Sequence, residues 1–457
     1  MAKERKVTPR QVALQILSSV ERRDAYVHIV LGNYLERTSL EQRDKGLVTE
    51  LVYGTLRRRL TLDWVIEQFS RYPLEKLAVP LRNNLRMAIY QILFLDNIPA
   101  AAACYEAVEL AKSFGHKGTA ALVNGILRSV LREPQRSDYI HAAQSMERAE
   151  GISLVHSHPL WLVEHWVEEL GLEETDKLCG ANNLSPTTFF RTNTLKTDRQ
   201  SLLNHLRSEG LGAEPGRFAP EAIRVSHVAS ITALQAFQLG QFVVQDEASM
   251  LPTHALAPSP GELCYDLCAG LGGKTLHMGE FMQDKGRILA FDLHPGKLEL
   301  LRKTAIRLGI TNVNTIKADA AQLDSRYLGK ANGVLLDAPC SGWGVLRGKP
   351  DIRWRIKPET VRALVDLQRR LLVSAYQCLA PGGRLVYSTC TINRAENEDN
   401  VAWLLEKYPG LQLLDIRERL PQGADLSLDL GEKTLQLMPH KHGTDGFFLA
   451  ALRKGEI

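Results

Sequence analysis

The chain has 457 residues, a length that suggests roughly two to four domains of about 100–200 residues each. Its composition, 44% hydrophobic and 24% charged, is typical of a protein with sizeable cores, and no apolar run is long enough to span a membrane. The charged first six residues are unlike a secretory signal. Seven cysteines at irregular spacing favour reduced thiols in a cytoplasm, and the absence of Cys/His pairs at zinc-finger spacing predicts no metal site.

Positive charge is concentrated towards the N-terminus. The formal net charge is +4, but residues 1–132 carry 20 Lys and Arg against 13 Asp and Glu, so the remainder is slightly acidic. This asymmetry favours a basic N-terminal module that binds a polyanion, although an ordinary solvated surface has the same composition. Within the module, Arg57-Arg58-Arg59 are either phosphate contacts or part of such a surface.

The first 132 residues show helical periodicity throughout. Thr8-Pro9 is typical of a helix N-terminus, in which a capping side chain precedes a proline. Apolar residues at helical spacing, interrupted by proline and glycine, predict helices over 9–20, 48–56, 62–69, 81–94, 101–113 and 119–131. Residues 133–158 are polar and poor in large apolar side chains, which predicts a linker.

A small α+β unit is expected after the linker. The pattern predicts a helix over 159–183, a strand over 187–196, a helix over 198–208, a strand over 223–225 and a short helix over 231–239. In the first strand, Arg191 and Asn193 are interpreted either as functional residues or as strand-edge surface with turn capping. The unit is too small to be the main enzyme core.

From residue 241 onward, strands alternate with helices. Strands are predicted over 263–267, 287–292, 313–318, 333–336 and 384–388, and helices over 274–282, 296–308, 358–379 and 396–407. Alternation of this kind indicates βαβ units and a doubly wound, Rossmann-like parallel sheet that is covered on both faces. Three further strands, over 411–414, 434–438 and 446–452, predict an antiparallel tail.

Ligand-binding residue types follow three successive strands. The loop after the first strand reads Cys268-Ala269-Gly270-Leu271-Gly272-Gly273-Lys274, and its glycines allow a ligand to approach the backbone at a helix N-terminus. Asp292 ends the second strand, where a ribose diol would bind, and Asp319 ends the third, a position suited to an adenine amine. Both aspartates are alternatively helix N-caps. Because a Gly-x-Gly-x-x-Gly fingerprint is missing, S-adenosyl-L-methionine is favoured over a dinucleotide.

Two cysteines follow two other strands. Cys340 ends the run 333–339 and Cys390 ends the run 383–389, so their thiols can converge on one substrate atom. The alternative for Cys390 is a buried structural cysteine, a common fate of free thiols. Trp343, Arg347 and Lys349, just after the first of these motifs, are either RNA contacts or a solvated loop.

Three motifs resemble the signature of the RNA cytosine-5 methyltransferase superfamily: Cys-Ala-x-x-Gly-Gly-Lys-Thr at 268–275, Asp-Ala-Pro-Cys-Ser-Gly at 337–342 and Ser-Thr-Cys at 388–390. Segments 51–57 and 121–128 resemble helices of the RNA-binding antitermination factor NusB, and 191–196 resembles a stretch of the RRM-like extension of RNA cytosine-5 methyltransferases. The whole chain therefore resembles the bacterial small-subunit ribosomal RNA methyltransferases of the Fmu/Sun family. It departs from that family at Leu271, where proline is usual.

The resemblance implies a site and a partner. It implies that the Cys390 thiolate attacks C6 of a cytidine in 16S ribosomal RNA, that Cys340 assists resolution of the adduct, and that Asp337 holds the base. It also implies that the loop 268–274 binds S-adenosyl-L-methionine together with Asp292, Asp319 and Asp337. We expect a NusB-like domain over 1–140, a linker with an RRM-like domain over 141–240 and a methyltransferase domain over 241–457, in a monomeric cytoplasmic protein.

Three other functions stay open at this point. The first is an RNA-binding ribosome-assembly or antitermination factor with an inactive methyltransferase-like domain, which would not need two thiols. The second is an exocyclic-amine methyltransferase, for which an Asn/Asp-Pro-Pro-Tyr type of motif is expected in place of residues 337–340. The third is a nicotinamide oxidoreductase, which the missing pyrophosphate fingerprint disfavours.

Overall fold

The computed structural model describes residues 7–226, 228, 230–421 and 433–456, so the charged start of the chain lies outside the described residues. Contacts divide the chain into two compact units: Met1–Leu184 with Leu346–Arg355, and Ser185–Val345 with Ile356–Ile457. In the described part of the chain, no helix combines the length and apolarity needed to cross a membrane.

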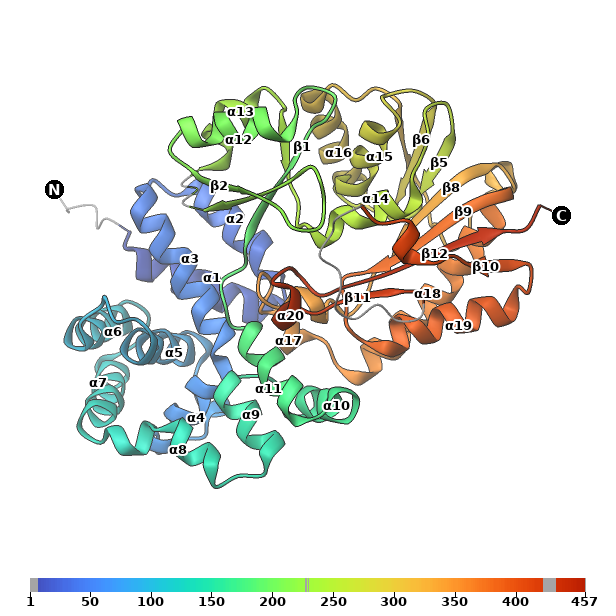
Figure 1. The fold of residues 1–457 in the computed structure, drawn as a ribbon. Helices are drawn as coiled ribbons and strands as arrows, with labels where there is room; N and C mark the ends of the chain where they lie inside the picture. The colour runs from blue at the N-terminus through green and yellow to red at the C-terminus, as the bar shows by residue number, and fades with distance from the viewer. Residues whose placement is uncertain (1–6, 227, 229, 422–432, 457) are drawn as a thin grey trace. The chain divides into compact units, whose positions relative to one another are not determined.

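The first unit is helical, as predicted (Figure 1). Its α1 begins at Pro9, and the Thr8 side chain accepts a hydrogen bond from the backbone N–H of Gln11 at 3.2 Å, which caps the helix. The elements are α1 Pro9–Arg23, α2 Val27–Arg37, α3 Gln42–Arg57, α4 Arg59–Phe69, η1 Leu74–Lys76, α5 Val79–Phe94, α6 Ala100–Phe114, α7 Lys117–Arg132, η2 Pro134–Ser137, α8 Tyr139–Gln144, α9 Arg148–His156, α10 Leu160–Leu170 and α11 Leu172–Ala181.

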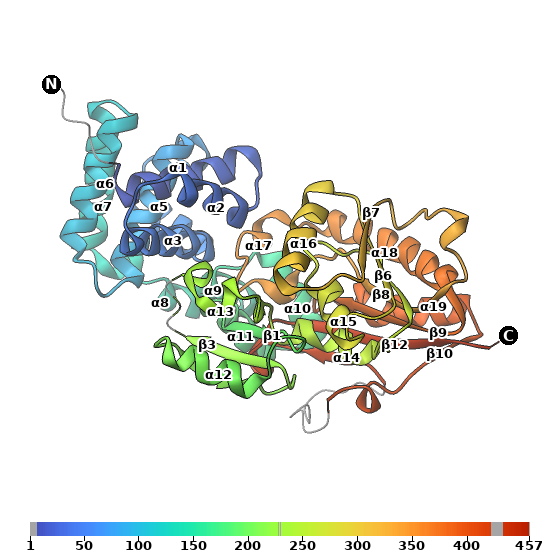
Figure 2. The same ribbon diagram turned by 90° about the horizontal axis from the view of Figure 1, so that it is seen from above.

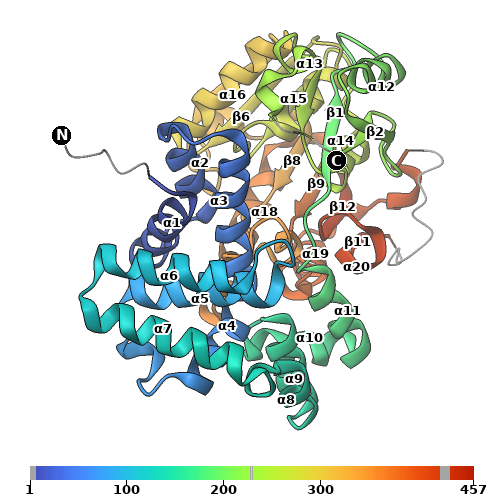
Figure 3. The ribbon, with the colours of Figure 1, turned by 90° about the vertical axis from the view of Figure 1, so that its left-hand side faces the viewer.

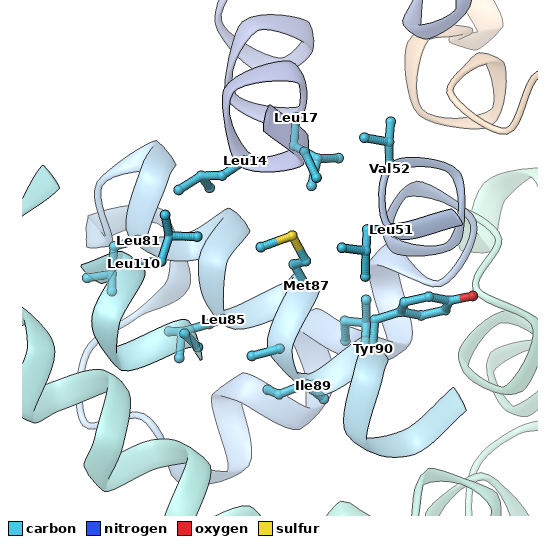
Figure 4. Packing of buried hydrophobic residues seen from close by; sticks show 14 of the residues in the cluster. Leu14, Leu17, Leu51, Val52, Leu81, Leu85, Met87, Ile89, Tyr90 and Leu110 are labelled. Atoms are coloured by element: carbon cyan, nitrogen blue, oxygen red, sulfur yellow. The ribbon is translucent and has the colours of Figure 1, made fainter. Parts of the chain in front are cut away.

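Helix α5 lies at the centre of this unit's core. Its Leu85, Met87 and Ile89 are 0–1% exposed, and Figure 4 shows them among side chains of α1, α3 and α6. Helices α6 and α7 pack side by side and complete the bundle (Figure 3). Burial of residues this large is the main stabilising contribution to a helical bundle.

The linker prediction for residues 133–158 is wrong. This segment forms η2, α8 and α9, and α9 packs on α4. Leu154 of α9 is 3% exposed, and its carbonyl accepts a hydrogen bond from the Thr61 hydroxyl at 2.7 Å. Few apolar residues are enough to pack these helices, because the neighbouring helices supply most of the apolar surface. A local sequence pattern does not reveal such partners.

The unit also contains ten residues from the second half of the chain, Leu346–Arg355, which end in the short helix α17, Ile352–Arg355. Arg353 is 1% exposed, and its guanidinium donates to the backbone carbonyls of Arg57, Ser157 and Asn182 at 3.1–3.3 Å. Burial lowers the pKa of Arg353 to about 9. The segment is therefore an integral part of this unit's core.

The contacts of Arg57 and Arg58 argue against a phosphate-binding or solvated face for these two members of the run Arg57-Arg58-Arg59. Arg57 is 8% exposed and donates to the carbonyl of Arg347, Arg58 donates to the carbonyl of Val155, and Arg59 lies 3.9 Å from Asp63. Arg57 and Arg58 therefore bind other segments of the unit, whereas Arg59, whose side chain is 34% exposed, pairs within α4. Trp343 and Arg347 are likewise buried, at 2% and 4% exposed, which argues against RNA contact by these two. Lys349 is exposed, and RNA contact stays a prediction for it.

The second unit begins with a four-stranded antiparallel sheet in the order β2-β3-β1-β4. Strands β1 and β3 and helix α12 were predicted from the sequence; the short β2 and β4 were not. The elements are β1 Thr188–Thr192, α12 Arg199–Ser208, β2 Gly212–Pro215, β3 Ala222–Ser226, η3 Ile231–Ala233, α13 Gln235–Gln238, β4 Phe242–Val244, η4 Ala248–Met250 and α14 Leu251–Leu256.

A larger sheet follows, with the order β10-β12-β9-β8-β5-β6-β7, and β11 pairs with β12. Strands β9, β8, β5, β6 and β7 are parallel, and β12 joins antiparallel to β9, as the sequence predicts. The strands are β5 Leu263–Asp266, β6 Arg287–Asp292, β7 Val313–Lys317, β8 Ala331–Asp337, β9 Leu379–Thr389, β10 Leu411–Leu413, β11 Leu435–Leu437 and β12 Phe447–Lys454.

Helices cover both faces of the large sheet (Figure 2). Leu335 of β8 packs in the cluster that contains α14 and α15, whereas its neighbours Val334 and Leu336 pack in the cluster that contains α18. The helical elements are α15 Gly273–Phe281, α16 Pro295–Leu308, η5 Ser325–Tyr327, η6 Trp343–Val345, α18 Pro358–Cys378, η7 Arg394–Glu396, α19 Glu398–Lys407, η8 Ile416–Glu418 and α20 Pro439–His442. The doubly wound arrangement places the carboxyl ends of β5, β6, β8 and β9 at one edge.

Candidate active site

The two predicted cysteines meet at the ends of β8 and β9. The strands are parallel neighbours with Asp337 opposite Ser388, and the Ala338 N–H donates to the Ser388 carbonyl at 2.9 Å. The sulfur atoms of Cys340 and Cys390 lie 3.3 Å apart, and both residues are half-buried. Adjacent strand ends thus bring together two thiols that are 50 residues apart in the sequence.

The surroundings of Cys340 favour the protonated form of its thiol. The hydrogen bond with Cys390, followed by burial, raises the pKa of Cys340 well above its ordinary value. Nearby Glu396 and Asp337 act in the same direction. The Cys340 thiol is therefore held protonated, in the form that can donate its proton towards the sulfur of Cys390.

Asp337 lies between the thiols and the glycine-rich loop. Its Oδ2 accepts a hydrogen bond from Lys274 Nζ at 2.6 Å, and its Oδ1 accepts one from the Ser388 hydroxyl at 2.9 Å. The carboxylate is about one-third exposed, so a ligand can still reach it. Asp337 thereby connects the loop after β5 with the end of β9.

Positive φ values fix the shape of the glycine-rich loop. Gly270 has φ +55° and Gly272 has φ +89°, and a Cβ on Gly272 would come within 2.4 Å of the Leu301 side chain. Asp292 Oδ2 accepts a hydrogen bond from the Gly270 N–H at 3.0 Å. Leu271 is 60% exposed and leaves this geometry intact, although it replaces the proline of the family that the sequence resembles.

A cavity of about 180 Å³ lies over this loop. It is lined by the predicted residues Cys268, Ala269, Gly270, Leu271, Gly273, Lys274 and Asp337, and also by Gln245, Ser249 and Asp266. Burial raises the pKa of Asp266 to about 7, and burial together with that carboxyl raises the pKa of the Cys268 thiol well above its ordinary value. A thiol held protonated in this way is a poor nucleophile, as expected for a loop cysteine without a chemical role.

The predicted aspartates Asp292 and Asp319, and also Gly272, are not in the lining of this cavity. Asp292 is 9% exposed and accepts hydrogen bonds from the backbone N–H groups of Gly270 and His294, so it holds the glycine-rich loop directly. Asp319 is exposed just after β7. Its Oδ1 accepts a hydrogen bond from the Ala321 N–H at 2.9 Å, so its side chain caps a turn. Contact with a nucleoside remains a prediction for both.

The small sheet supplies a residue that the sequence did not assign to the cofactor end. Arg191 is 0% exposed; its guanidinium donates to the carbonyl of Gly273 at 2.6 Å, to Gln245 Oε1 and to Glu280 Oε1 at 2.8 Å. Asn193, also fully buried, donates to the carbonyls of Gly240 and Leu308. Both residues therefore bind the small sheet to the methyltransferase sheet, and neither is strand-edge surface.

A second buried polar cluster connects α15 with the segment before β3. Glu221 accepts from the Nε2 atoms of His254 and His277 at 2.9–3.1 Å, and these three side chains come from the turn before β3, from α14 and from α15. Burial lowers the pKa of His277 to about 3, so its ring is neutral. The sequence gives no signal for the cluster, because its members are far apart in the chain.

Three family models match the chain. They are described as "NusB family" for residues 7–132, "RsmF/B-like, ferredoxin-like domain" for residues 158–232 and "16S rRNA methyltransferase RsmB/F" for residues 253–453. The helical, small α+β and doubly wound parts of the structure correspond to these three matches.

Sequence and structure relatives agree with these matches. A Bacillus subtilis protein named "Probable ribosomal RNA small subunit methyltransferase B" is 37% identical over 98% of this chain and 99% of its own length. The crystal structure of PH0851 has a TM-score of 0.82 at 28% identity and covers 98% of this chain and 99% of its own. NSun6 from Pyrococcus horikoshii with SFG has a TM-score of 0.56 at 26% identity and covers 64% of this chain and 97% of its own.

The glycine-rich loop, the carboxylates at strand ends and the doubly wound sheet define a methyltransferase of the S-adenosyl-L-methionine-dependent class. The match over the full chain is more specific, and the chain belongs to the 16S rRNA methyltransferase RsmB/F family. The predicted three-part fold, the family and the cofactor are confirmed.

The residues at the cavity fit this cofactor. A Cβ on Gly273 would meet only Gln245, at 3.8 Å, so the glycine leaves open a path to the backbone at the start of α15. The free N–H groups of a helix N-terminus favour a carboxylate, and the Asp337 carboxylate favours a cationic amine or sulfonium. The loop 268–274 with Asp337 would hold the cofactor, and Asp292 supports the loop.

Proposed function

We propose that this protein methylates C5 of a cytidine in 16S ribosomal RNA through a covalent bond between Cys390 and C6, acting as a monomer in the cytoplasm. The observation that supports it most is the 3.3 Å contact between Cys340 and Cys390, beside Asp337. An exocyclic-amine methyltransferase would need no thiol. The names of the relatives support the choice of ribosomal RNA.

The thiols divide the covalent chemistry between them. The Cys390 sulfur attacks C6, an S–C6 bond forms, and the electron pair of the C5–C6 double bond makes C5 nucleophilic. S-adenosyl-L-methionine, when bound, supplies an electrophilic methyl group for C5. The C5 proton then leaves to water, the double bond re-forms, and the Cys390 thiolate is expelled.

Cys340 is suited to the last step. Its raised pKa keeps its proton in place, and the 3.3 Å contact lets that proton stabilise the departing thiolate of Cys390. Asp337 selects the base: a carboxylate at the strand end accepts a hydrogen bond from the exocyclic amine of cytosine, which uracil lacks. The target base must leave its stack to reach this edge of the sheet.

The proposal is tested by the product. Purified protein is incubated with S-adenosyl-L-methionine and transcripts of 16S and 23S ribosomal RNA, and digested nucleosides are analysed by mass spectrometry. We expect 5-methylcytidine at one position of the 16S transcript and none with Cys390→Ala. Methylation of an exocyclic amine, or unchanged activity of Cys390→Ala, would contradict the proposal.

A further inference from the structure

A buried carboxylate lies directly behind the two thiols. Glu396 ends the short helix η7, six residues after Cys390, and is 0% exposed. The surrounding stretch 394–399 is rich in charge and is typical of the polar start of a helix, so the sequence alone indicates no role for Glu396. A fully buried carboxylate is costly unless its oxygens are satisfied, so its partners indicate why it is there.

Four hydrogen bonds converge on the Glu396 carboxylate, and three of them come from the two cysteine loops. From the Cys340 loop, Ser341 donates its N–H at 2.9 Å and its hydroxyl at 2.5 Å. From the Cys390 loop, Asn393 donates its side-chain amide at 3.0 Å. The fourth donor is Gln368 of α18, at 2.9 Å, and the same amide group donates to the carbonyl of Pro339.

The donors are neutral. Within the described part of the chain, Glu396 makes no ion pair with Lys, Arg or His, and its four donors are one backbone amide, one hydroxyl and two side-chain amides. An ionised carboxylate accepts in about four directions, so this set uses its capacity fully. Directional bonds, and not a mobile ion pair, fix the positions of the donors.

A second layer holds Glu396 from behind. The Tyr387 hydroxyl donates to the Glu396 carbonyl at 2.5 Å, and the Asn400 amide donates to the same carbonyl at 3.2 Å. Asn400 also donates to Gln368 Oε1 at 2.9 Å, which orients the Gln368 amide towards the carboxylate. All three supporting residues are 0% exposed. Glu396 is thus held in one position, and it transmits that position to both loops.

We propose that Glu396 is a positioning residue that holds the Cys340 and Cys390 loops in register, so that both sulfur atoms reach the same base. The inference rests on the proposed covalent function and extends it to a residue that touches neither substrate nor cofactor. Its negative charge near the pair also helps to keep the proton on Cys340, in the direction of the pKa shift described above.

Substitution by glutamine is the sharpest test. Glu396→Gln keeps the size but replaces one acceptor oxygen by an N–H₂ group that faces donors, so at least one loop must move. A displacement of about 1 Å at a catalytic group lowers turnover by about 100-fold. The matched control is Asp399→Asn, the same change three residues away on an exposed carboxylate that pairs only with Arg394 among the contacts described.

The first readout measures the distance between the thiols without any methylation. Diamide oxidises two neighbouring thiols to a disulfide; the two thiols lose two protons and two electrons, and diamide is reduced to the hydrazine. In the parent and in Asp399→Asn, mass spectrometry should find rapid formation of the Cys340–Cys390 disulfide. In Glu396→Gln the rate should fall by about tenfold or more, since exchange chemistry depends steeply on approach of the sulfurs.

The second readout separates a local from a general effect. We expect kcat of Glu396→Gln to fall by about 100-fold, with the Kd for S-adenosyl-L-methionine and the thermal unfolding curve close to those of the parent. Ser341→Ala removes one donor only and should lower kcat by about tenfold. This variant provides the test if Glu396→Gln fails to fold. Parent-like disulfide formation and kcat in both variants would overturn the inference.

The two proposals fail in different ways. If the parent forms no 5-methylcytidine, the proposed function is wrong, and the disulfide rates still report whether Glu396 positions the thiols. If the parent is active and Glu396→Gln matches it in both readouts, only the inference about Glu396 is wrong.

Discussion

The thiol end and the cofactor end of the site are held by opposite kinds of polar contact. At the thiol end, all the hydrogen bonds that the Glu396 carboxylate accepts from described residues come from neutral donors. At the cofactor end, cations pair with carboxylates: Lys274 with Asp337 at 2.6 Å and Arg191 with Glu280 at 2.8 Å. Both ends lie in the same unit, at the same edge of one sheet.

This difference matches what each end has to do. A cation next to the thiols would pull protons off both sulfurs, whereas the proposed chemistry needs one thiol and one thiolate. The cofactor end instead has to accept a charged ligand, and ion pairs that surround a partly open cavity can rearrange around it. The contrast suggests that changes at the thiol end reduce kcat, and changes at the cofactor end weaken cofactor binding.

The largest effect is expected from crowding the thiol end at Gly344. Its N–H donates to the Cys390 carbonyl at 3.1 Å, and an added Cβ would lie 2.0 Å from the Gly446 carbonyl oxygen and 2.8 Å from the Cys390 carbonyl oxygen. Gly344→Ala must therefore displace the Cys390 loop, and we expect kcat to fall by about 100-fold or more. The measurement is the rate of 5-methylcytidine formation at saturating substrates.

The matched control for this prediction is Gly296→Ala at the start of α16, where an added Cβ meets nothing within 4 Å. Its kcat should equal that of the parent. A Gly344→Ala protein with the parent's kcat would show that the thiol end is tolerant, and the contrast between the two ends would be lost.

A smaller effect, on binding, is expected from Arg191→Lys. Lysine keeps the positive charge beside Glu280 but loses the fork that also reaches the carbonyl of Gly273. We expect the Kd for S-adenosyl-L-methionine, measured by calorimetry, to rise about tenfold, while kcat at saturation changes little. Arg224→Lys, on the exposed face of the same small sheet, is the control. A fall in kcat with an unchanged Kd would reverse the assignment.

The pH dependence of stability offers a third test, at Asp266. Burial raises the pKa of this carboxyl from 3.8 to about 7. Between about pH 4 and pH 7 the folded protein therefore holds a proton that the unfolded chain has released, so this group's stabilising contribution is lost as the pH rises through that window. Asp266→Asn does not titrate, and each unit of pKa difference corresponds to about 1.4 kcal/mol.

The expected result is a change in relative stability. The Tm of Asp266→Asn minus that of the parent, measured without cofactor, should be several degrees more positive at pH 8 than at pH 5. A difference that is the same at both pH values would mean that Asp266 is ionised throughout in the folded protein.

The smallest effect is expected at Leu271. The Leu271 side chain is 60% exposed and lies between two glycines with positive φ. These glycines determine the conformation of the loop without a contribution from Leu271. Leu271→Pro should stabilise the protein by about 0.4–1 kcal/mol, because it restricts the unfolded chain, and should change the Kd for the cofactor less than about twofold. Chemical denaturation measures the first quantity; a large loss of cofactor affinity would show that the leucine itself contacts the ligand.

Much of the second unit follows from local pattern. The apolar run before Cys340 and the run before Cys390 predicted two adjacent strand ends, and the structure places their sulfurs 3.3 Å apart. The glycines of residues 268–274 likewise predicted a loop of unusual backbone conformation, and Gly270 and Gly272 have positive φ. Strand ends and turns are local properties, and the sequence carries them directly.

Buried charge was not predictable in this way. Arg57, Arg191 and Glu396 are charged residues for which a local pattern suggests a surface position, and all are buried because partners far away in the sequence satisfy them. The segment 133–158 was missed for the same reason, since its apolar partners lie on other helices. Such residues are recognised only when the tertiary contacts are known.

The central claim is that Cys390 is the nucleophile and Cys340 its partner. The most direct test is to incubate the protein with S-adenosyl-L-methionine and 16S ribosomal RNA that contains 5-fluorocytidine, which blocks loss of the C5 substituent and traps the adduct. After digestion, mass spectrometry should find the modified nucleotide on the peptide that contains Cys390, in the parent and in Cys340→Ala, and no adduct in Cys390→Ala. A nucleotide attached to Cys340, or trapping by Cys390→Ala, would contradict the account.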